Sequence, residues 1–443
     1  MKRIFPAYAY GSGPRNGCCW DQTIEPLDLP ALDSEVRADV AIVGAGFTGI
    51  SAALHLAELG AEVVVLEAET VGWGASGRNG GFCCLGGSMA SDDLIDRKFS
   101  KHDRLAWRRT EKAAVSLVSD LIERLDIDVD RHSKGETRLA HSARTARAFE
   151  TEARRAEENY GMRPILIEGR DLARHGMDGS FHGGLTVPVG FALNPRKYLL
   201  GLANAAQQAG ARIFSLSPVI MVEETAGKVQ LETPSGNLQA DQVVIATNGY
   251  SSENVPRQMA GQYMPVQSNV LVTRPLSDPE LERQGWTTQQ MCYDSLNLLH
   301  YFRLMPDSRF LFGMRGGLFS SARAEQGARR ATEGHFRSCF PAWSKVEIEY
   351  AWSGFACMSR KLFPFVGLLD GSRRISAALC YHGNGVAMAT YAGALLADRL
   401  SGTGALDTPA VMNSPLKAFP LGRWRRALMP PAYGLLRCLD RLA

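Results

Sequence analysis

A glycine pattern early in the chain constrains the fold more than any other feature. The apolar run at residues 40–43 is typical of a buried parallel strand, and it leads directly into G-x-G-x-x-G at residues 44–49. A helical pattern follows, Gly60 ends it, and a second apolar run, 63–66, stops at Glu67. This order predicts a complete strand–helix–strand unit that binds a dinucleotide.

Each part of this unit has a physical task. Gly44 permits the tight turn, Gly46 lets the backbone approach a pyrophosphate, and Gly49 lets the helix and the strand pack closely. The first amides of the helix direct partial positive charge at the phosphates, and Glu67 is placed to accept hydrogen bonds from ribose hydroxyls. The contacts predicted here are Gly44, Ala45, Gly46, Phe47, Thr48, Gly49, Glu67 and Ala68.

A second glycine-rich segment decides between the common dinucleotides. An acid at position 67 suits FAD and NAD and disfavours NADP, but a nicotinamide dehydrogenase usually continues into further strand–helix units. Here the chain enters the glycine-rich loop 70–91, which indicates backbone lying against a flat ligand, and we predict FAD. Arg78 and Asn79 would offer donors to a phosphate or to the flavin edge. The contacts predicted in this loop are Gly74, Ala75, Ser76, Arg78, Asn79, Gly80 and Gly81.

Two later segments are predicted to return to the same cofactor. Residues 246–249 end a buried strand and resemble the second FAD contact of flavoproteins of the glutathione-reductase type. Residues 383–386 lead into a helix whose free amides would stabilise the negative charge of a reduced flavin. The contacts predicted from this part of the chain are Val219, Thr247, Asn248, Gly249, Gly383, Asn384, Gly385 and Val386.

The order of the expected elements indicates a discontinuous architecture for the 443 residues. We predict an α/β plus α+β fold, in which a Rossmann-type FAD-binding domain of the glutathione-reductase type receives an inserted substrate domain with an antiparallel sheet. The predicted FAD-binding domain comprises residues 31–95, 185–260 and 355–410, and the predicted substrate domain comprises residues 96–184 and 261–354. Residues 411–443 are predicted to form a basic amphipathic tail.

The cofactor motifs carry a family resemblance that covers about residues 20–405. The segment 40–81 resembles the D-amino-acid oxidase-like superfamily of FAD-dependent oxidoreductases, which includes glycine and sarcosine oxidases. The strings 77–81 and 381–386 are most similar to the γ-glutamylputrescine oxidase branch. The resemblance implies that a small amine or amino acid, with a secondary amine favoured, is oxidised by hydride transfer to flavin N5. The imine would then hydrolyse, and oxygen would reoxidise the flavin and yield hydrogen peroxide.

Such chemistry requires neither a nucleophile nor a metal, and no cysteine–histidine set has zinc spacing. An aromatic wall with an arginine would suit a substrate that has an apolar body and a carboxylate, although ordinary strands with outward-facing arginines explain the same pattern. A sarcosine-type carboxylate clamp is not expected, because Ala387 stands where similar sarcosine oxidases carry a lysine. The predicted catalytic candidates are Tyr301, Arg303, Arg315, Trp352 and His382, with a structural role as the alternative for the histidine.

The charge distribution leaves the electron acceptor open. The formal net charge is +3, yet six basic residues and one acidic residue stand from Lys417 onward, so the remainder is slightly acidic. This tail either packs on the body or lies on an anionic membrane. The leading hypothesis is an oxidase that uses oxygen, and the alternative is a membrane-associated dehydrogenase that reduces quinone. A non-catalytic nucleotide-binding protein or an RNA-modifying flavoprotein is the alternative of another class.

Partners and location follow from the same composition. A near-neutral balance argues against nucleic-acid binding, so the expected partners are the amine substrate and its electron acceptor. The first residues lack the apolar region of a signal peptide, and no apolar run is long enough for a membrane span. The sequence therefore predicts a cytoplasmic protein, with a position at the inner face of the membrane as the alternative.

Overall fold

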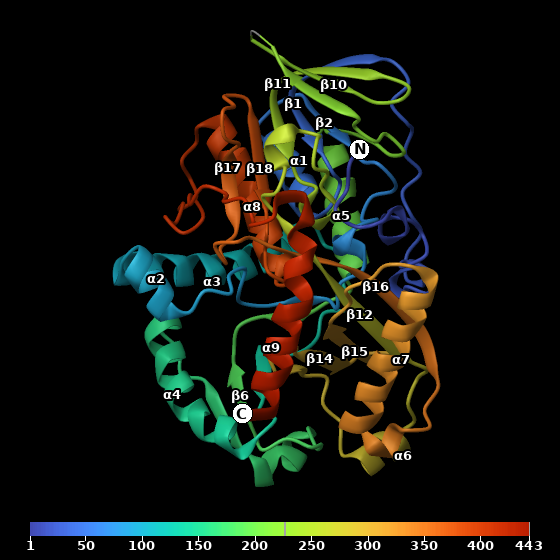
Figure 1. Cartoon of the computed structure of the whole chain (residues 1–443), viewed down its shortest axis with the longest axis vertical. Coiled ribbons are helices and arrows are strands. Elements are labelled where there is room, and N and C mark those ends of the chain that lie inside the picture. Colours follow the sequence, from blue (N-terminus) through green and yellow to red (C-terminus); the bar gives the residue numbers. More distant parts are fainter. Residues whose placement is uncertain (226, 443) are drawn as a thin grey trace.

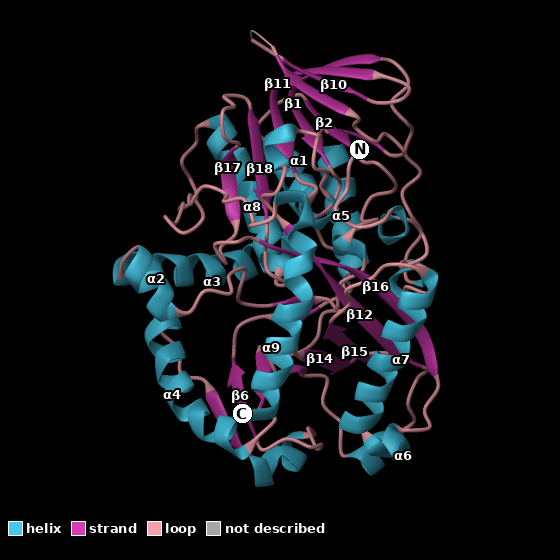
Figure 2. Cartoon of the chain, in the orientation of Figure 1, coloured by secondary structure: helices cyan, strands magenta, loops and turns pink. Residues whose placement is uncertain are grey.

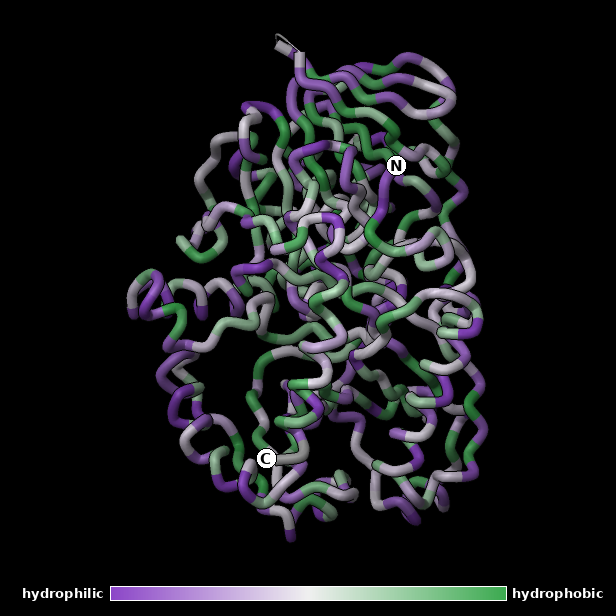
Figure 3. Tube along the Cα trace, viewed as in Figure 1, coloured by the Kyte–Doolittle hydropathy of each residue, from purple (hydrophilic) through white to green (hydrophobic). Residues whose placement is uncertain are grey.

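Two eight-stranded sheets, one in the upper and one in the lower half of Figure 1, organise the chain. The computed structural model describes residues 1–225 and 227–442. Figure 2 shows helices beside the upper sheet and α6 and α7 on the outer side of the lower one. In Figure 3 hydrophobic stretches concentrate along the upper strands, whereas the α4 region is mostly hydrophilic.

The first sheet is mostly parallel and contains the predicted strand–helix–strand unit. Its order is β17-β18-β11-β1-β2-β8, and β10 and β9 continue from β11 as an antiparallel meander. Its strands are β1 (Glu35–Val43), β2 (Val63–Leu66), β8 (Arg212–Phe214), β9 (Met221–Glu224), β10 (Val229–Glu232), β11 (Asn237–Ile245), β17 (Phe365–Leu368) and β18 (Ile375–Leu379). β1 begins earlier than its apolar run indicates, because its polar first residues pair in register with β11 from Glu35↔Asn237 onward.

Three helices pack on this sheet through small residues: α1 (Phe47–Glu58), α5 (Pro195–Gln208) and α8 (Gly385–Ser401). A Cβ atom at Gly49 would lie 1.9 Å from the carbonyl oxygen of Gly44, so α1 starts directly against the turn that follows β1. A Cβ atom at Gly393 would lie 2.3 Å from the carbonyl oxygen of Thr48, so α8 and α1 are in backbone contact. The last helix of the parallel unit therefore comes from the far end of the chain.

The second sheet has the order β16-β12-β15-β14-β13-β4-β6-β5. All of its pairs are antiparallel, as the sequence predicts, except β13 with β4. Its strands are β4 (Glu136–Leu139), β5 (Ile165–Glu168), β6 (Gly183–Val187), β12 (Met264–Thr273), β13 (Met291–Asp294), β14 (His300–Leu304), β15 (Phe310–Arg315) and β16 (Ile348–Met358). The predicted domain boundaries after residues 184 and 354 fall inside β6 and β16. The division into two domains stays a prediction.

One face of the second sheet is sealed by aromatic packing. Phe302, Phe310 and Phe312 alternate out of β14 and β15 and contact Phe336 and Phe340 of α7 and the turn after it. The opposite face is left to line a cavity. The remaining helices and short strands are α2 (Asp92–Lys98), α3 (Lys101–Arg124), α4 (Ala143–Tyr160), α6 (Asp278–Gln284), α7 (Ala322–Cys339), α9 (Met429–Leu442), β3 (Phe82–Cys83) and β7 (Phe191–Ala192).

The first 34 residues lack long elements but are packed against the glycine-rich loop. The Trp20 indole donates a hydrogen bond to the carbonyl of Asn79 at 2.8 Å, and the Arg15 guanidinium donates one to the carbonyl of Trp73 at 3.0 Å. Both side chains are buried. This segment therefore supports the predicted cofactor loop, a role that its irregular sequence does not indicate.

The tail packs on the body over part of its length. The Arg425 guanidinium is fully buried and makes two hydrogen bonds to the Glu253 carboxylate, at 2.6 and 2.8 Å. Trp424 and Leu435, in contrast, are 67% and 62% exposed. Within residues 1–225 and 227–442, no helix has the length and apolar character needed to span a membrane. The tail thus combines an anchored segment with an exposed apolar surface.

Candidate functional site

Two connected cavities follow the first turn of α1. The narrower, of about 120 Å³, lies at the carboxyl ends of β1, β2 and β11. The wider, of about 330 Å³, extends from there to the open face of the second sheet. The residues common to both walls are Phe47, Ala75, Ser76, Asn248, Tyr381 and Ala389.

The narrower cavity has the features of a dinucleotide site. Both carboxylate oxygens of Glu67 accept backbone hydrogen bonds, from Ala45 at 2.8 Å and from Glu69 at 3.1 Å, and burial raises the pKa of this carboxyl group. These bonds hold the acid beside the glycine turn. The predicted residues that line this cavity are Gly44, Ala45, Gly46, Phe47, Thr48, Glu67, Ala68, Gly74, Ala75, Ser76, Val219, Thr247 and Asn248.

Close backbone packing explains the glycines of this wall. Gly44 has a φ of +106°, which disfavours any side chain. A Cβ atom at Gly46 would lie 2.8 Å from the Ser76 hydroxyl, which accepts a hydrogen bond from the Phe47 N–H. Gly49 and Gly249 do not line either cavity. The geometry assigns them to packing rather than to ligand contact.

The wider cavity gathers the rest of the predicted cofactor loop and three of the catalytic candidates. Gly81 lies behind the wall, where a Cβ atom would be 2.0 Å from the Leu193 carbonyl. The predicted residues that line this cavity are Ala75, Ser76, Arg78, Asn79, Gly80, Gly383, Asn384, Gly385 and Val386 from the cofactor set, and Tyr301, Arg315 and His382 from the catalytic set.

Two observations show that this cavity fits a flavin. Arg78 is buried, donates to the carbonyls of Trp73 and Ser353 at 2.7 and 3.3 Å, and keeps an Nη2 atom for which the described residues provide no acceptor. The N-cap Asn384 makes no capping bond to α8, because its side chain donates to the Leu85 carbonyl at 2.6 Å. The first amides of α8 therefore stand at the cavity wall with their partial positive charge available.

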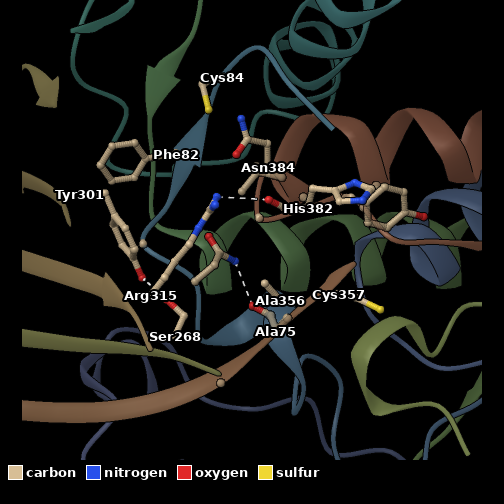
Figure 4. Close-up of a pocket in the computed structure, with 18 of the residues that line it drawn as sticks. Ala75, Phe82, Cys84, Ser268, Tyr301, Arg315, Ala356, Cys357, His382 and Asn384 are labelled. Atoms are coloured by element: carbon tan, nitrogen blue, oxygen red, sulfur yellow. Dashed lines mark hydrogen bonds between the residues drawn. The ribbon is translucent and has the colours of Figure 1, made fainter. Parts of the chain in front are cut away.

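Arg315 is a cationic group of the wider cavity, in addition to Arg78. Its guanidinium donates to the carbonyl of His382 at 3.2 Å, and no ion pair to it is found in the described part of the chain. Burial lowers the pKa of this group. Figure 4 shows Arg315 between Tyr301 and the turn that carries Asn384. The Tyr301 hydroxyl lies 3.0 Å from that of Ser268, which fixes the ring beside the guanidinium.

His382 is neutral and held at both ring nitrogens. Nδ1 lies 3.0 Å from the carbonyl oxygen of Gly87, and Nε2 accepts the Ser359 N–H at 3.2 Å. Burial lowers the pKa of the imidazole to about 4. The geometry therefore gives this histidine the structural role that the sequence left as the alternative, and its carbonyl oxygen rather than its ring meets Arg315.

Arg303 and Trp352 do not line the wider cavity. The Arg303 guanidinium donates to the carbonyls of Gly80 and Leu193 at 3.1 and 2.9 Å, and the Trp352 indole donates to the carbonyl of Arg78 at 2.7 Å. The expectation of substrate contact at these two residues is therefore corrected. Both side chains are turned toward backbone carbonyls and support the glycine loop from behind.

Sequence reasoning missed several residues of the wider cavity. Glu136 of β4 and Tyr293 of β13 line it, as do Cys84 and Leu299. No local motif marks Glu136, Tyr293 or Leu299, which reach the site through the pairing of β4, β13 and β14, whereas Cys84 lies within the glycine-rich loop 70–91. Among the described residues, no group of three or more His, Cys, Asp or Glu is arranged to hold a metal ion.

Comparisons with known proteins agree with this geometry. The family model of FAD-dependent oxidoreductases named DAO matches residues 39–399. The chain is 33% identical over 423 residues to the gamma-glutamylputrescine oxidoreductase of Escherichia coli K12, covering 94% of this chain and 96% of that protein. It is 24% identical over 377 residues to the glycine oxidase of Bacillus licheniformis, covering 83% of this chain and 94% of that protein.

Solved structures show the same fold. The glycine oxidase of Geobacillus kaustophilus superposes with a TM-score of 0.69 at 21% identity, covering 86% of this chain and all of that one. The L-proline dehydrogenase of P. horikoshii superposes with a TM-score of 0.67 at 17% identity, covering 86% of this chain and 96% of that one. The predictions of the fold class, of FAD as cofactor and of an oxidoreductase acting on CH–NH or CH–NH2 groups are confirmed. The chain belongs to the DAO family of FAD-dependent oxidoreductases.

Proposed function

We propose that the protein oxidises a small amine or amino acid, with a secondary amine favoured, and that its substrate carries a carboxylate. The observation that carries this proposal is the Arg315 guanidinium, which faces the wider cavity without an acidic partner among the described residues. A guanidinium binds a carboxylate through two parallel hydrogen bonds. FAD, held by the residues that line the two cavities, would supply the hydride acceptor and the reoxidation by oxygen that yields hydrogen peroxide.

The residues of this chain supply position and electrostatics. Arg315 and Tyr301 would orient the substrate, and the apolar side chains of Phe82, Val270 and Leu299 exclude water from the reacting carbon. The first amides of α8 offer positive charge where negative charge develops during the transfer. The imine product hydrolyses in water and requires no side chain for that step.

Anaerobic bleaching of the bound flavin tests this proposal. The amine panel comprises sarcosine, pipecolate, proline and γ-glutamylputrescine, the last because of the 33% identical relative. We expect at least one of these amines to remove the visible flavin absorbance, and admission of oxygen to restore it with stoichiometric hydrogen peroxide. If no amine in the panel bleaches the flavin, the proposal fails.

The exposed side chains of the tail support a second candidate, a membrane-associated dehydrogenase that passes electrons to quinone. Leu421, Trp424, Leu435 and Leu439 are all at least 45% exposed. Together with the basic residues of the tail, such a surface suits an anionic bilayer. Slow reoxidation of the reduced flavin by oxygen, with fast reoxidation by a quinone analogue, would favour this candidate.

A further inference from the structure

The helix at the end of the chain lies against the wall of the wider cavity. α9 has 14 residues and is therefore about 20 Å long, and it crosses from the upper into the lower half of the molecule (Figure 1). Tyr433, Leu436 and Asp440 are half-buried, and their spacing places them on one face of the helix. Leu435 and Leu439 are 62% and 45% exposed. α9 thus has an inner face toward the body and an apolar outer face.

The beginning of α9 is fixed to the body. Met429 is buried, and shortly before it the Arg425 guanidinium forms an ion pair with the Glu253 carboxylate at 2.6 Å. The Arg426 guanidinium donates a hydrogen bond to the carbonyl of Leu318, in the loop that follows β15, at 2.6 Å. These contacts hold the first turn of the helix in one place.

The far end of α9 is attached to the body by one side chain. The Asp440 carboxylate accepts hydrogen bonds from the backbone N–H and the side-chain amide of Asn297, both at 2.7 Å, and from the N–H of Leu298 at 3.4 Å. Both residues lie in the turn between β13 and β14. Among residues 1–225 and 227–440, no other hydrogen bond or ion pair is found between α9 beyond Met429 and the body. We call these three hydrogen bonds of Asp440 the latch.

The latched turn continues into the cavity wall. Leu299 directly follows Leu298 and lines the cavity, as does Arg315, whose N–H donates to the Leu299 carbonyl at 3.5 Å. Tyr433 does not line the cavity, and its hydroxyl is enclosed without a partner among the described residues. Burial raises the pKa of Tyr433 to about 12, against the opposing effect of the nearby Arg315 charge. α9 therefore lies behind the wall that Leu299 and Arg315 form.

We propose that α9 is a gate of the wider cavity, which opens when Asp440 releases the turn 297–298 and closes when it binds this turn again. In the closed state the latch holds Leu299 and Arg315 in place around the substrate. In the open state α9 pivots on its fixed first turn, and a ligand enters or leaves. The inference rests on the proposed function only in taking this cavity as the substrate site. Asp440 is a positioning residue, because it acts through the turn and does not line the cavity.

The small size of the latch makes such opening accessible. Asp440 is only half-buried, so water can replace the hydrogen bonds from Asn297 and Leu298 when the helix moves away. The net cost of exchanging a protein hydrogen bond for one to water is small compared with its strength in isolation. A minor open population is therefore expected in the free protein, and a bound substrate that contacts the closed wall would reduce it.

Access to the flavin tests the gate without any amine. Acrylamide quenches flavin fluorescence by collision, and the closed gate should limit that collision. In D440A, which lacks the latch, we expect the quenching constant to rise about 3-fold or more at unchanged flavin content. N297A removes one of the three hydrogen bonds and should give a smaller rise. The matched control is D370A, because Asp370 is exposed in the turn between β17 and β18 and should match the wild type.

Cys438 offers a probe on the helix itself. It is exposed, whereas Cys339 is half-buried and the other seven cysteines are buried, so a nitroxide label in a C339S background reports on α9. We expect a mobile component of the label spectrum to grow in D440A and not in D370A. In the wild-type latch, this component should decrease when the amine of the panel that bleaches the flavin is added without oxygen.

Flavin reduction by the same amine separates gating from chemistry. Because Asp440 does not line the cavity, the limiting rate at saturating amine in D440A should stay within about 2-fold of the wild type. The half-saturating amine concentration should rise about 5-fold, since the closed complex is no longer held. A helix with a purely structural role would change thermal melting and leave this ratio unchanged.

The outcomes separate the inference from the proposed function. Equal quenching constants in D440A and the wild type would overturn the gate. So would a rise in quenching with an unchanged half-saturating concentration, because α9 would then shield the flavin without holding the substrate. If D440A is purified without flavin, N297A, which keeps two of the three hydrogen bonds, decides in its place. If no amine of the panel bleaches the flavin, the proposed function fails, and the quenching and label measurements still decide whether α9 closes the cavity.

Discussion

The guanidinium of Arg315 donates a hydrogen bond to the carbonyl oxygen of His382 over 3.2 Å, and so joins the end of β15 to the turn before α8. This turn is held in an unusual conformation, with φ values of +53° at His382 and +106° at Gly383. The ring of His382 fixes the turn through Gly87 and Ser359. The group that would bind the substrate is therefore attached to the segment that would lie against the flavin.

Replacing Arg315 should separate substrate binding from cofactor binding. In R315M, the KM for a carboxylate-bearing amine should rise about 100-fold, since two charge-assisted hydrogen bonds are lost. FAD content should stay at one per chain. R329M, at an exposed position of α7, serves as the control and should match the wild type. An unchanged KM in R315M would show that the carboxylate binds elsewhere.

Gly49 should be irreplaceable for FAD binding. A Cβ atom there would lie 1.9 Å from the Gly44 carbonyl oxygen, so G49A must displace α1 from the turn that is predicted to receive the pyrophosphate. We expect purified G49A to lack flavin absorbance. G334A is the matched control, because Gly334 of α7 has no neighbour within 4 Å, and alanine should stabilise that helix by up to about 1 kcal/mol. A full complement of FAD in G49A would contradict the close packing described here.

His382 should contribute to the dependence of stability on pH. Its unfolded pKa is about 6.5 and its folded pKa is about 4, because burial disfavours the charged ring. Protonation therefore favours the unfolded chain, so the contribution is complete above pH 6.5 and is lost as the pH falls toward 4. In H382Q, urea unfolding should show a slope between pH 6.5 and 4 that is smaller by about 1.4 kcal/mol per pH unit. Equal slopes in the two proteins would show that the ring is not buried in its neutral form.

The ion pair between Arg425 and Glu253 should anchor the tail. R425M leaves the carboxylate without its partner and should lower the free energy of unfolding by about 3 kcal/mol. R423M is the control, because Arg423 stacks on the exposed Trp424 and should be neutral. Urea unfolding followed by flavin fluorescence measures both variants. Equal midpoints for R425M and the wild type would indicate that the tail does not depend on this pair.

Most residues predicted from local sequence signals to contact FAD line one of the two cavities, and their contact with FAD stays a prediction. Residue type indicates the local backbone conformation at three places: the turn 44–49, the acid at 67 and the segment 383–386. Glycines and residues that begin a helix are found where the backbone needs a particular conformation, so a local pattern is enough to predict it. The substrate side is different. Glu136 reaches the cavity because β4 pairs with β13, whose residues lie about 150 positions further along the chain, and no local pattern reports such a pairing.

Arg303 and Arg315, on the neighbouring strands β14 and β15, also show that local sequence patterns do not indicate which side chains reach the cavity. Arg303 directly follows Phe302 and Arg315 stands three residues after Phe312, so the sequence does not distinguish their roles, yet only Arg315 lines the cavity. Arg303 instead meets the carbonyls of Gly80 and Leu193, which belong to segments distant from it in the chain. The roles of side chains at the substrate end of the cavity therefore depend on tertiary packing, which local sequence patterns do not indicate.

The origin of α8 has a consequence for protein synthesis. β18 and α8 complete the nucleotide-binding sheet, and α8 lies in backbone contact with α1. During translation the first strand–helix–strand unit emerges long before these partners, and the face of its apolar helix α1 that packs against α8 has no permanent cover until Ser401 has left the ribosome. Chaperones would have to shield α1 during that interval. Cofactor capture should accordingly be a late event, and chains that terminate early should be degraded rather than loaded with FAD.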